Sequence, residues 1–135
     1  MRIIGLDWGE ARIGVAVSDP LMITAQPLLS LENNEEFIGK LKAIVSEYGA
    51  GEIVLGLPKQ MNGKSGIAAS KVTDFRKKIC SEIPIKVSLF DERLSTKIAQ
   101  RSFAASGASR KKRKGFIDAV TAGIILQGYI DSKLS

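Results

Sequence analysis

Histidine is absent from this 135-residue sequence, and cysteine occurs once, as Cys80. Without histidine, one chain cannot form a serine–histidine or cysteine–histidine catalytic pair, or a histidine-ligated metal site. A lone cysteine cannot close an internal disulfide or a zinc site of paired cysteines. Its neighbours Ile79 and Ile83 indicate that Cys80 is a small core residue. Any bound metal must therefore be held by oxygen ligands, which Mg²⁺ and Mn²⁺ prefer.

Long hydrophobic runs are also missing. No segment approaches the roughly 18 apolar residues of a membrane span, and the first ten residues, MRIIGLDWGE, lack the extended apolar stretch of a signal peptide. Hydrophobic residues make up 44% of the chain and charged residues 25%, which is ordinary for a globular protein. We expect one domain over residues 1–135, located in the cytoplasm.

The excess of positive charge is confined to one segment. The formal net charge is +6, and the run Arg110–Lys114 (RKKRK) supplies five of the 20 basic residues. Outside this run, 15 basic residues face 14 acidic ones. Such a run is either a solvated loop or a surface for a polyanion such as nucleic acid, and composition alone favours neither.

Hydrophobic periodicity predicts an α/β fold. Two β-rich runs joined by a short turn predict a hairpin, and a later continuous apolar run predicts a strand buried on both faces. The first helix has Asn33 and Asn34 as candidate N-caps and ends at Gly49. The expected strands are 2–8, 12–18, 27–31, 53–55 and 83–90, and the expected helices are 37–48, 68–79, 95–106 and 115–130. This order predicts a mixed sheet with helices on both faces.

Four carboxylates stand at the ends of these elements. Asp7 ends the first strand, Asp91 and Glu92 end the last strand, and Asp118 opens the apolar stripe of the last helix. Each alone has an ordinary explanation. Aspartate favours turns, an acid can pair with a neighbouring arginine, and an acid in a first helical turn is stabilised by the helix dipole. None of these explains why three elements all end in acids.

The clustering of these acids predicts a metal site. Ligands of open sheets bind outside the carboxyl ends of parallel strands, and a buried last helix can bring Asp118 to that edge. Like charges placed so close are unfavourable unless they share a cation. Two Mg²⁺ or Mn²⁺ ions can support phosphodiester cleavage without a histidine base. If strand alternation continues, Asp91 and Glu92 point to opposite faces, so that one is a ligand and the other a partner of Arg93.

The loop after the strand 53–55 contains Gly63-Lys64-Ser65, which resembles the end of a phosphate-binding P-loop. That motif requires glycine five positions before Gly63, and Pro58 occupies this position. Proline lacks an N–H group and cannot adopt a positive φ. We therefore expect a turn or a substrate-facing loop here, and no nucleotide cradle.

Four motifs, in order along nearly the whole chain, resemble the RuvX-like family, also called YqgF, of small bacterial proteins. The motifs are GLDWGEARIGVAVSD, IVLGLP with MNG, DERLST and KGFIDAVTAGIIL. The resemblance implies a ribonuclease H-like fold, whose five-stranded mixed sheet combines an antiparallel hairpin with parallel strands. It also implies a metal-dependent nuclease. The family is linked to maturation of the 5′ end of pre-16S rRNA and, by fold analogy, to Holliday-junction resolution in DNA recombination and repair.

The resemblance also assigns residues. It places the four acids on the family's acidic positions, and Arg93 and Thr96 on its strand–helix corner. The expected catalytic residues are Asp7, Asp91, Glu92 and Asp118. Three of them, Asp7, Glu92 and Asp118, are the expected ligands of Mg²⁺ or Mn²⁺ in a two-metal site. The expected nucleic-acid contacts are Arg12, Arg93, Thr96, Arg110, Lys111, Lys112, Arg113 and Lys114.

Two other functions compete with the nuclease. Gly5-x-Asp7-x-Gly9 also resembles the phosphate-binding start of actin-like ATPases and sugar kinases, but those need two lobes, which 135 residues cannot supply. The other is a non-catalytic nucleic-acid-binding protein with the same fold. The expected partners are nucleic acid, with RNA favoured over DNA, and ribosomal precursor particles. No membrane association is expected, and the expected oligomeric state is a monomer or weak homodimer. The residues alone do not distinguish RNA from DNA.

Overall fold

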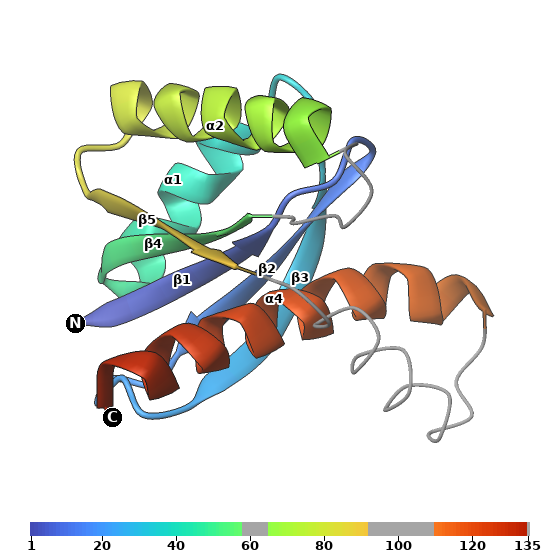
Figure 1. Ribbon diagram of the computed structural model, residues 1–135. Coiled ribbons are helices and arrows are strands. Elements are labelled where there is room, and N and C mark those ends of the chain that lie inside the picture. The colour runs from blue at the N-terminus through green and yellow to red at the C-terminus, as the bar shows by residue number, and fades with distance from the viewer. Residues whose placement is uncertain (58–64, 92–109, 135) are drawn as a thin grey trace.

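The computed structural model describes the backbone of residues 1–57, 65–91 and 110–134, and the side chains of residues 1–57, 70–90 and 117–133 (Figure 1). Its strands are β1 (Arg2–Asp7), β2 (Arg12–Ser18), β3 (Ala25–Glu32), β4 (Ala50–Leu57) and β5 (Lys86–Asp91). Its helices are α1 (Phe37–Tyr48), α2 (Ser65–Glu82) and α4 (Arg110–Leu134). The helix predicted at 95–106 lies outside the described residues.

The strands form one five-stranded mixed sheet in the order β3-β2-β1-β4-β5. β1, β2 and β3 are successive antiparallel neighbours, and β4 and β5 then add parallel to β1. Parallel strands need crossover connections, and the helix α1 between β3 and β4 and the helix α2 between β4 and β5 lie in those connections. The predicted mixed sheet, with its antiparallel hairpin and parallel strands, is confirmed.

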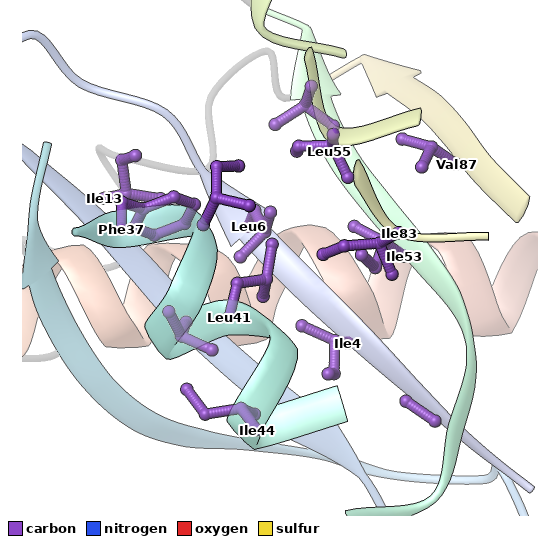
Figure 2. Close-up of a cluster of buried hydrophobic side chains, with 14 of the residues drawn as sticks. Ile4, Leu6, Ile13, Phe37, Leu41, Ile44, Ile53, Leu55, Ile83 and Val87 are labelled. Atoms are coloured by element: carbon purple, nitrogen blue, oxygen red, sulfur yellow. The ribbon is translucent and has the colours of Figure 1, made fainter. Parts of the chain in front are cut away.

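Two helices, α1 and α2, cover one face of the sheet (Figure 1). Alternation along β1 directs Ile4 and Leu6 to this face, where both are fully buried. Figure 2 shows them beside Phe37 and Leu41 of α1. The same cluster takes in Ile53 and Leu55 of β4, Val72 and Ile79 of α2, and Val87 of β5. Burial of these side chains attaches both crossover helices to the sheet.

The other face of the sheet is covered by α4 (Figure 1). Ile3 of β1, Ala16 of β2 and Val54 of β4 pack there against the apolar stripe of the helix. That stripe consists of Ala122, Ile125, Leu126, Tyr129 and Ile130. The last helix is thus largely buried from Ala119 to Ile130, as its composition predicts. In the part of the chain that the structure describes, no helix is long and apolar enough to cross a membrane.

Glycines in β1 and β2 let α4 lie directly on the sheet. A Cβ atom added at Gly5 would lie 2.7 Å from the Cβ of Leu126 and 3.0 Å from the carbonyl oxygen of Ala122. One added at Gly14 would lie 1.8 Å from the carbonyl oxygen of Asp118. No side chain fits at either position without a shift of the helix, so these glycines set the distance between helix and sheet.

Some element ends differ from the sequence predictions, since the strand predicted from Ile83 begins at Lys86 and the helix predicted from Gly115 begins at Arg110. Two predictions about single residues are also wrong. The N-cap of α1 is Glu36, without a side-chain cap hydrogen bond. Neither asparagine caps the helix, because the Asn34 side chain accepts the N–H of Glu36 in a preceding turn, and the Asn33 side chain donates to the carbonyl of Gly9. Cys80 is exposed rather than buried, because it follows Ile79 by one residue and one step turns a helix by about 100°. The predicted end of α1 at Gly49, with φ of 62°, is confirmed.

Candidate functional site

Three parallel strands end at one edge of the sheet, and two of them end in an acid. β1 ends at Asp7, β4 at Leu57 and β5 at Asp91. Leu6 pairs with Leu55, and Leu57 pairs with Asp91. The ends of β1 and β5 therefore flank the end of β4. This is the carboxyl edge at which ligands bind in open sheets.

Strand alternation places Asp7 on the face covered by α4. Asp7 follows Gly5 by two residues, and Gly5 lies against Leu126 of α4, so both belong to that face. Across the hairpin Asp7 pairs with Gly14, and Gly14 pairs in turn with Ser30 of β3. These three residues form one row across the sheet, which we call the Asp7 row.

The start of the buried part of α4 lies over the Asp7 row. The backbone of Asp118 contacts Gly14, the middle residue of the row. The carboxylate oxygen Oδ2 of Asp118 accepts hydrogen bonds from Nε of Arg12, at 2.9 Å, and from Oγ of Ser30, at 3.3 Å. A residue 111 positions after Asp7 in the chain thus lies one strand away from it in space. The helix carries Asp118 to the row, and Arg12 and Ser30 orient its carboxylate.

Charge at this edge is only partly shielded from water. The side chain of Arg12 is 36% exposed and that of Asp118 is 24% exposed, so a dissolved ion can reach them. In the adjacent hairpin turn, Glu10 pairs with Lys71 of α2. The hydrogen bond from the Lys71 ammonium, and its charge, hold the pKa of Glu10 below its ordinary value.

The structure describes some of the predicted site residues only by their backbone, and others not at all. Asp91 is the last residue of β5, but its side chain is not among those described. Glu92, Arg93 and Thr96 lie outside the described residues. The basic run Arg110–Lys114 forms the start of α4, so it is helical and not a loop, although its side chains are not described.

The donor set at this edge suits a hard divalent cation. Asp7 and Asp118 offer carboxylate oxygens from neighbouring elements on one face, which is the ligand chemistry of Mg²⁺ and Mn²⁺. Among the described side chains, no three acids or cysteines come together as a metal-binding group. A third carboxylate would have to come from residues 91–92. The residues present therefore fit such an ion as two members of a larger ligand set.

Sequence reasoning missed two residues of this site. Ser30 contacts the Asp118 carboxylate, and its signal is a single polar residue within the apolar run PLLSL. Gly14 admits the backbone of Asp118, and its signal is a glycine between the β-branched residues of a strand, RIGVAV. A glycine within a strand often marks the close approach of another backbone.

A family model described as "RuvX: Holliday junction resolvase" matches residues 1–132. The chain belongs to the RuvX family. A relative from Geobacillus kaustophilus, named "Putative pre-16S rRNA nuclease", is 46% identical over 137 residues, covering 98% of this chain and 99% of the relative. A relative of the same name from Clostridium acetobutylicum is 46% identical over 134 residues, with the same coverage. The resemblance seen in the motifs is confirmed.

Solved structures outside the RuvX family share the fold. A resolvase of Fowlpox virus, in complex with Holliday junction DNA, has a TM-score of 0.57 and 16% identity, covering all of both chains. The RuvC protein of Thermus thermophilus, in complex with a Holliday junction substrate, has a TM-score of 0.54 and 14% identity, covering 100% of this chain and 96% of that one. At such identities the likeness concerns the fold alone, and it confirms the predicted ribonuclease H-like fold.

Proposed function

We propose that this protein is a metal-dependent nuclease that processes the 5′ end of pre-16S rRNA, through one nuclease domain over residues 1–135. The observation that carries the proposal is the position of Asp118 over the Asp7 row, which brings two acids to the carboxyl edge of the sheet. Full-length relatives named for this activity support the choice of substrate. Processing of rRNA would place the protein in the cytoplasm. The proposed oligomeric state is a monomer or weak homodimer.

Asp7, Asp118 and Glu92 are the proposed ligands of Mg²⁺ or Mn²⁺, with Asp91 as the fourth catalytic acid. Two bound ions would supply an activated water and stabilise the leaving oxygen. The chain's part is to hold the carboxylates in place. Packing of α4 on the sheet sets where Asp118 stands, and Arg12 and Ser30 fix the direction of its carboxylate.

Phosphate binding is proposed for the basic residues around these acids. Arg110–Lys114 and Asp118 belong to one helix. Lys114 precedes Asp118 by four residues, and residues four apart in a helix lie on the same side, about 6 Å apart along its axis. A phosphate backbone held by the run would therefore pass close to the acids. Arg12, Arg93 and Thr96 are the proposed contacts nearer to the scissile bond. Such contacts position the strand without reading its sequence.

The test is cleavage of a substrate panel with Mg²⁺, with Mn²⁺ and with EDTA. The panel contains precursor 16S rRNA, single-stranded RNA, duplex DNA and a four-way DNA junction. We expect metal-dependent cleavage of the rRNA precursor. Asp7→Asn and Asp118→Asn should each lower the rate at least about a hundredfold, since metal ions contribute several kcal/mol to the transition state.

Asp131→Asn is the matched control, because Asp131 is an exposed acid on the same helix and accepts a hydrogen bond from the Gln127 side chain. It should cleave at the wild-type rate. Mn²⁺ should also raise the melting temperature of the wild type by binding the folded state alone. Cleavage in EDTA, or a near-normal rate for Asp7→Asn, would contradict the proposal.

Holliday-junction resolution is the second candidate. The description of the matching family names this activity. The panel separates the two, because a resolvase would cut the four-way junction at paired positions and leave precursor rRNA intact. Binding of the panel without cleavage under any metal condition would instead indicate a non-catalytic nucleic-acid-binding protein.

A further inference from the structure

A cation of the chain itself already occupies one side of Asp118. Arg12 donates from Nε to Oδ2 of Asp118, and Ser30 donates to the same oxygen. Among the described residues, Oδ2 accepts both hydrogen bonds made to this carboxylate. Within the described part of the chain, Oδ1 is the oxygen left for another ligand.

Arg12 reaches Asp118 because of its place in β2. It precedes Gly14 by two residues, and alternation therefore puts it on the same face, under the start of the buried part of α4. The contact uses one nitrogen instead of the two-pronged geometry that arginine usually makes with carboxylates. Because Arg12 contacts Asp118 through one nitrogen and the carboxylate is partly exposed, a metal ion that binds Asp118 can shift this hydrogen bond.

We propose that Arg12 is an internal counter-ion of Asp118, which partly neutralises the acidic edge before a divalent cation binds and competes with that cation afterwards. The inference rests on the proposed function for the presence of a metal at this edge. Without metal, the positive charge of Arg12 offsets repulsion between the carboxylates of the edge. Once metal is bound, the same charge repels it, so Arg12 lowers the affinity for the metal.

This role differs from that of an ordinary surface ion pair. An ion pair that only supports the fold would change stability equally with and without metal, and would leave the metal dissociation constant unchanged. A counter-ion that competes with the metal has opposite effects on the two quantities. Its removal should destabilise the metal-free protein and tighten metal binding.

The experiment measures both quantities in Arg12→Gln. Thermal melts in EDTA give the stability of the metal-free protein, and calorimetric titration with Mn²⁺ at fixed ionic strength gives the dissociation constant. We expect the metal-free melting temperature to fall by a few degrees. Mn²⁺ should bind about three- to tenfold more tightly, the size expected for removing one charge several ångströms from a divalent ion in a largely aqueous setting.

Three further variants isolate the charge at position 12. Arg2→Gln removes an equal charge from the opposite end of the hairpin, where Arg2 stacks on the ring of Tyr48, and it should leave the dissociation constant unchanged. Ser30→Ala removes the second hydrogen bond without a change of charge and should alter the constant less than about twofold. Arg12→Lys keeps the charge and should bind Mn²⁺ as the wild type does.

The outcomes separate this inference from the proposed function. If the wild type binds Mn²⁺ and Arg12→Gln binds it equally or more weakly, the counter-ion role is wrong while the metal site stands. Tighter binding by Arg12→Lys would also overturn it, since the charge is then not the cause. If the wild type binds no Mn²⁺ and its melting temperature does not respond to the ion, the metal-dependent function and this inference both fail.

Discussion

Asp19 organises the turn between β2 and β3 through its carboxylate. Its Oδ1 accepts the backbone N–H groups of Ile23, at 2.7 Å, and Thr24, at 2.8 Å. Within this turn, Met22 has a φ of 58°, in the left-handed region that disfavours any residue with a side chain. The Asp19 hydrogen bonds compensate for this strain. One ionised side chain thereby fixes the shape of the turn.

The pH dependence of this turn follows from the same bonds. The N–H of Thr24, and next that of Ile23, hold the pKa of Asp19 below its ordinary value of 3.8. Because the folded-state pKa is lowered, the stabilisation is present above pH 3.8 and is lost as the pH falls through the lower, folded-state value. We expect the amide NMR signals of Ile23 and Thr24 to titrate with a midpoint below 3.8.

Asp19→Asn is the control for that titration, because asparagine keeps an oxygen acceptor but has no charge to lose. Its Ile23 and Thr24 signals should not shift over the same acidic range. A midpoint at or above 3.8 in the wild type would mean that the amides do not favour the ionised form.

At the scale of elements, α4 depends on glycines of the sheet. A side chain at Gly14 would meet the backbone of Asp118 and not a flexible side chain. The conflict cannot be relieved by a change of rotamer, so the helix itself must move. Because α4 carries Asp118, such a movement also displaces the carboxylate from the Asp7 row.

Gly14→Ala should therefore lower both stability and activity. We expect the free energy of unfolding, from urea titration, to fall by about 1–3 kcal/mol, as for other overpacked sites. Gly39→Ala is the matched control, since nothing lies within 4 Å of a Cβ at Gly39 on the exposed side of α1. It should raise stability by about 0.5–1 kcal/mol through helix propensity. Equal effects of the two substitutions would contradict the close approach of α4.

Most helices and strands could be predicted because the spacing of hydrophobic residues reflects which faces of each element are buried. Continuous apolar residues in Ile53-Val54-Leu55 report burial on both faces, and the structure buries all three completely. The predictions for Cys80 and for the N-cap of α1 were wrong because the environment of a single residue depends on helical phase and on tertiary contacts. Asn33 illustrates the second cause, since its side chain binds Gly9, 24 residues away. No local pattern records a contact of that kind.

At the scale of the whole molecule, one acid of the carboxyl edge, Asp118, shares the helix α4 with the basic run. The sequence identified Asp7 and Asp118 as candidates because each ends or begins an apolar element. It could not indicate that Arg12 and Ser30 meet Asp118, because these contacts span 106 and 88 residues. Roles for Asp91, Glu92, Arg93, Thr96 and the basic run stay predictions.

Replacement of all five residues of Arg110–Lys114 by Gln should weaken nucleic-acid binding irrespective of sequence. Each lost phosphate contact flattens the log–log salt dependence by about 0.7 on single strands, so the slope should change by up to about 3.5. Glutamine preserves helix propensity, so α4 should remain intact. Filter binding of single-stranded RNA over a range of KCl concentrations measures the slope.

The control removes five exposed lysines that lie away from the carboxyl edge and from the basic run. Lys40 and Lys42 of α1 and Lys77 and Lys78 of α2 lie on the opposite face of the sheet from α4 (Figure 1), and Lys86 begins β5, at the other end of that strand from Asp91. The net charge falls equally, but the slope should change little. Similar slopes for the two variants would mean that binding responds to total charge and not to the basic run.

Because the basic run and Asp118 lie on one continuous helix, their relation is fixed by helical phase. A residue inserted between Lys114 and Asp118 would turn the run by about 100° around the helix axis and advance it by about 1.5 Å. Four inserted residues would return it close to its original direction, but about 6 Å farther away. The number of residues between the run and Asp118 therefore sets both the distance and the direction from the phosphate-binding side chains to this acid.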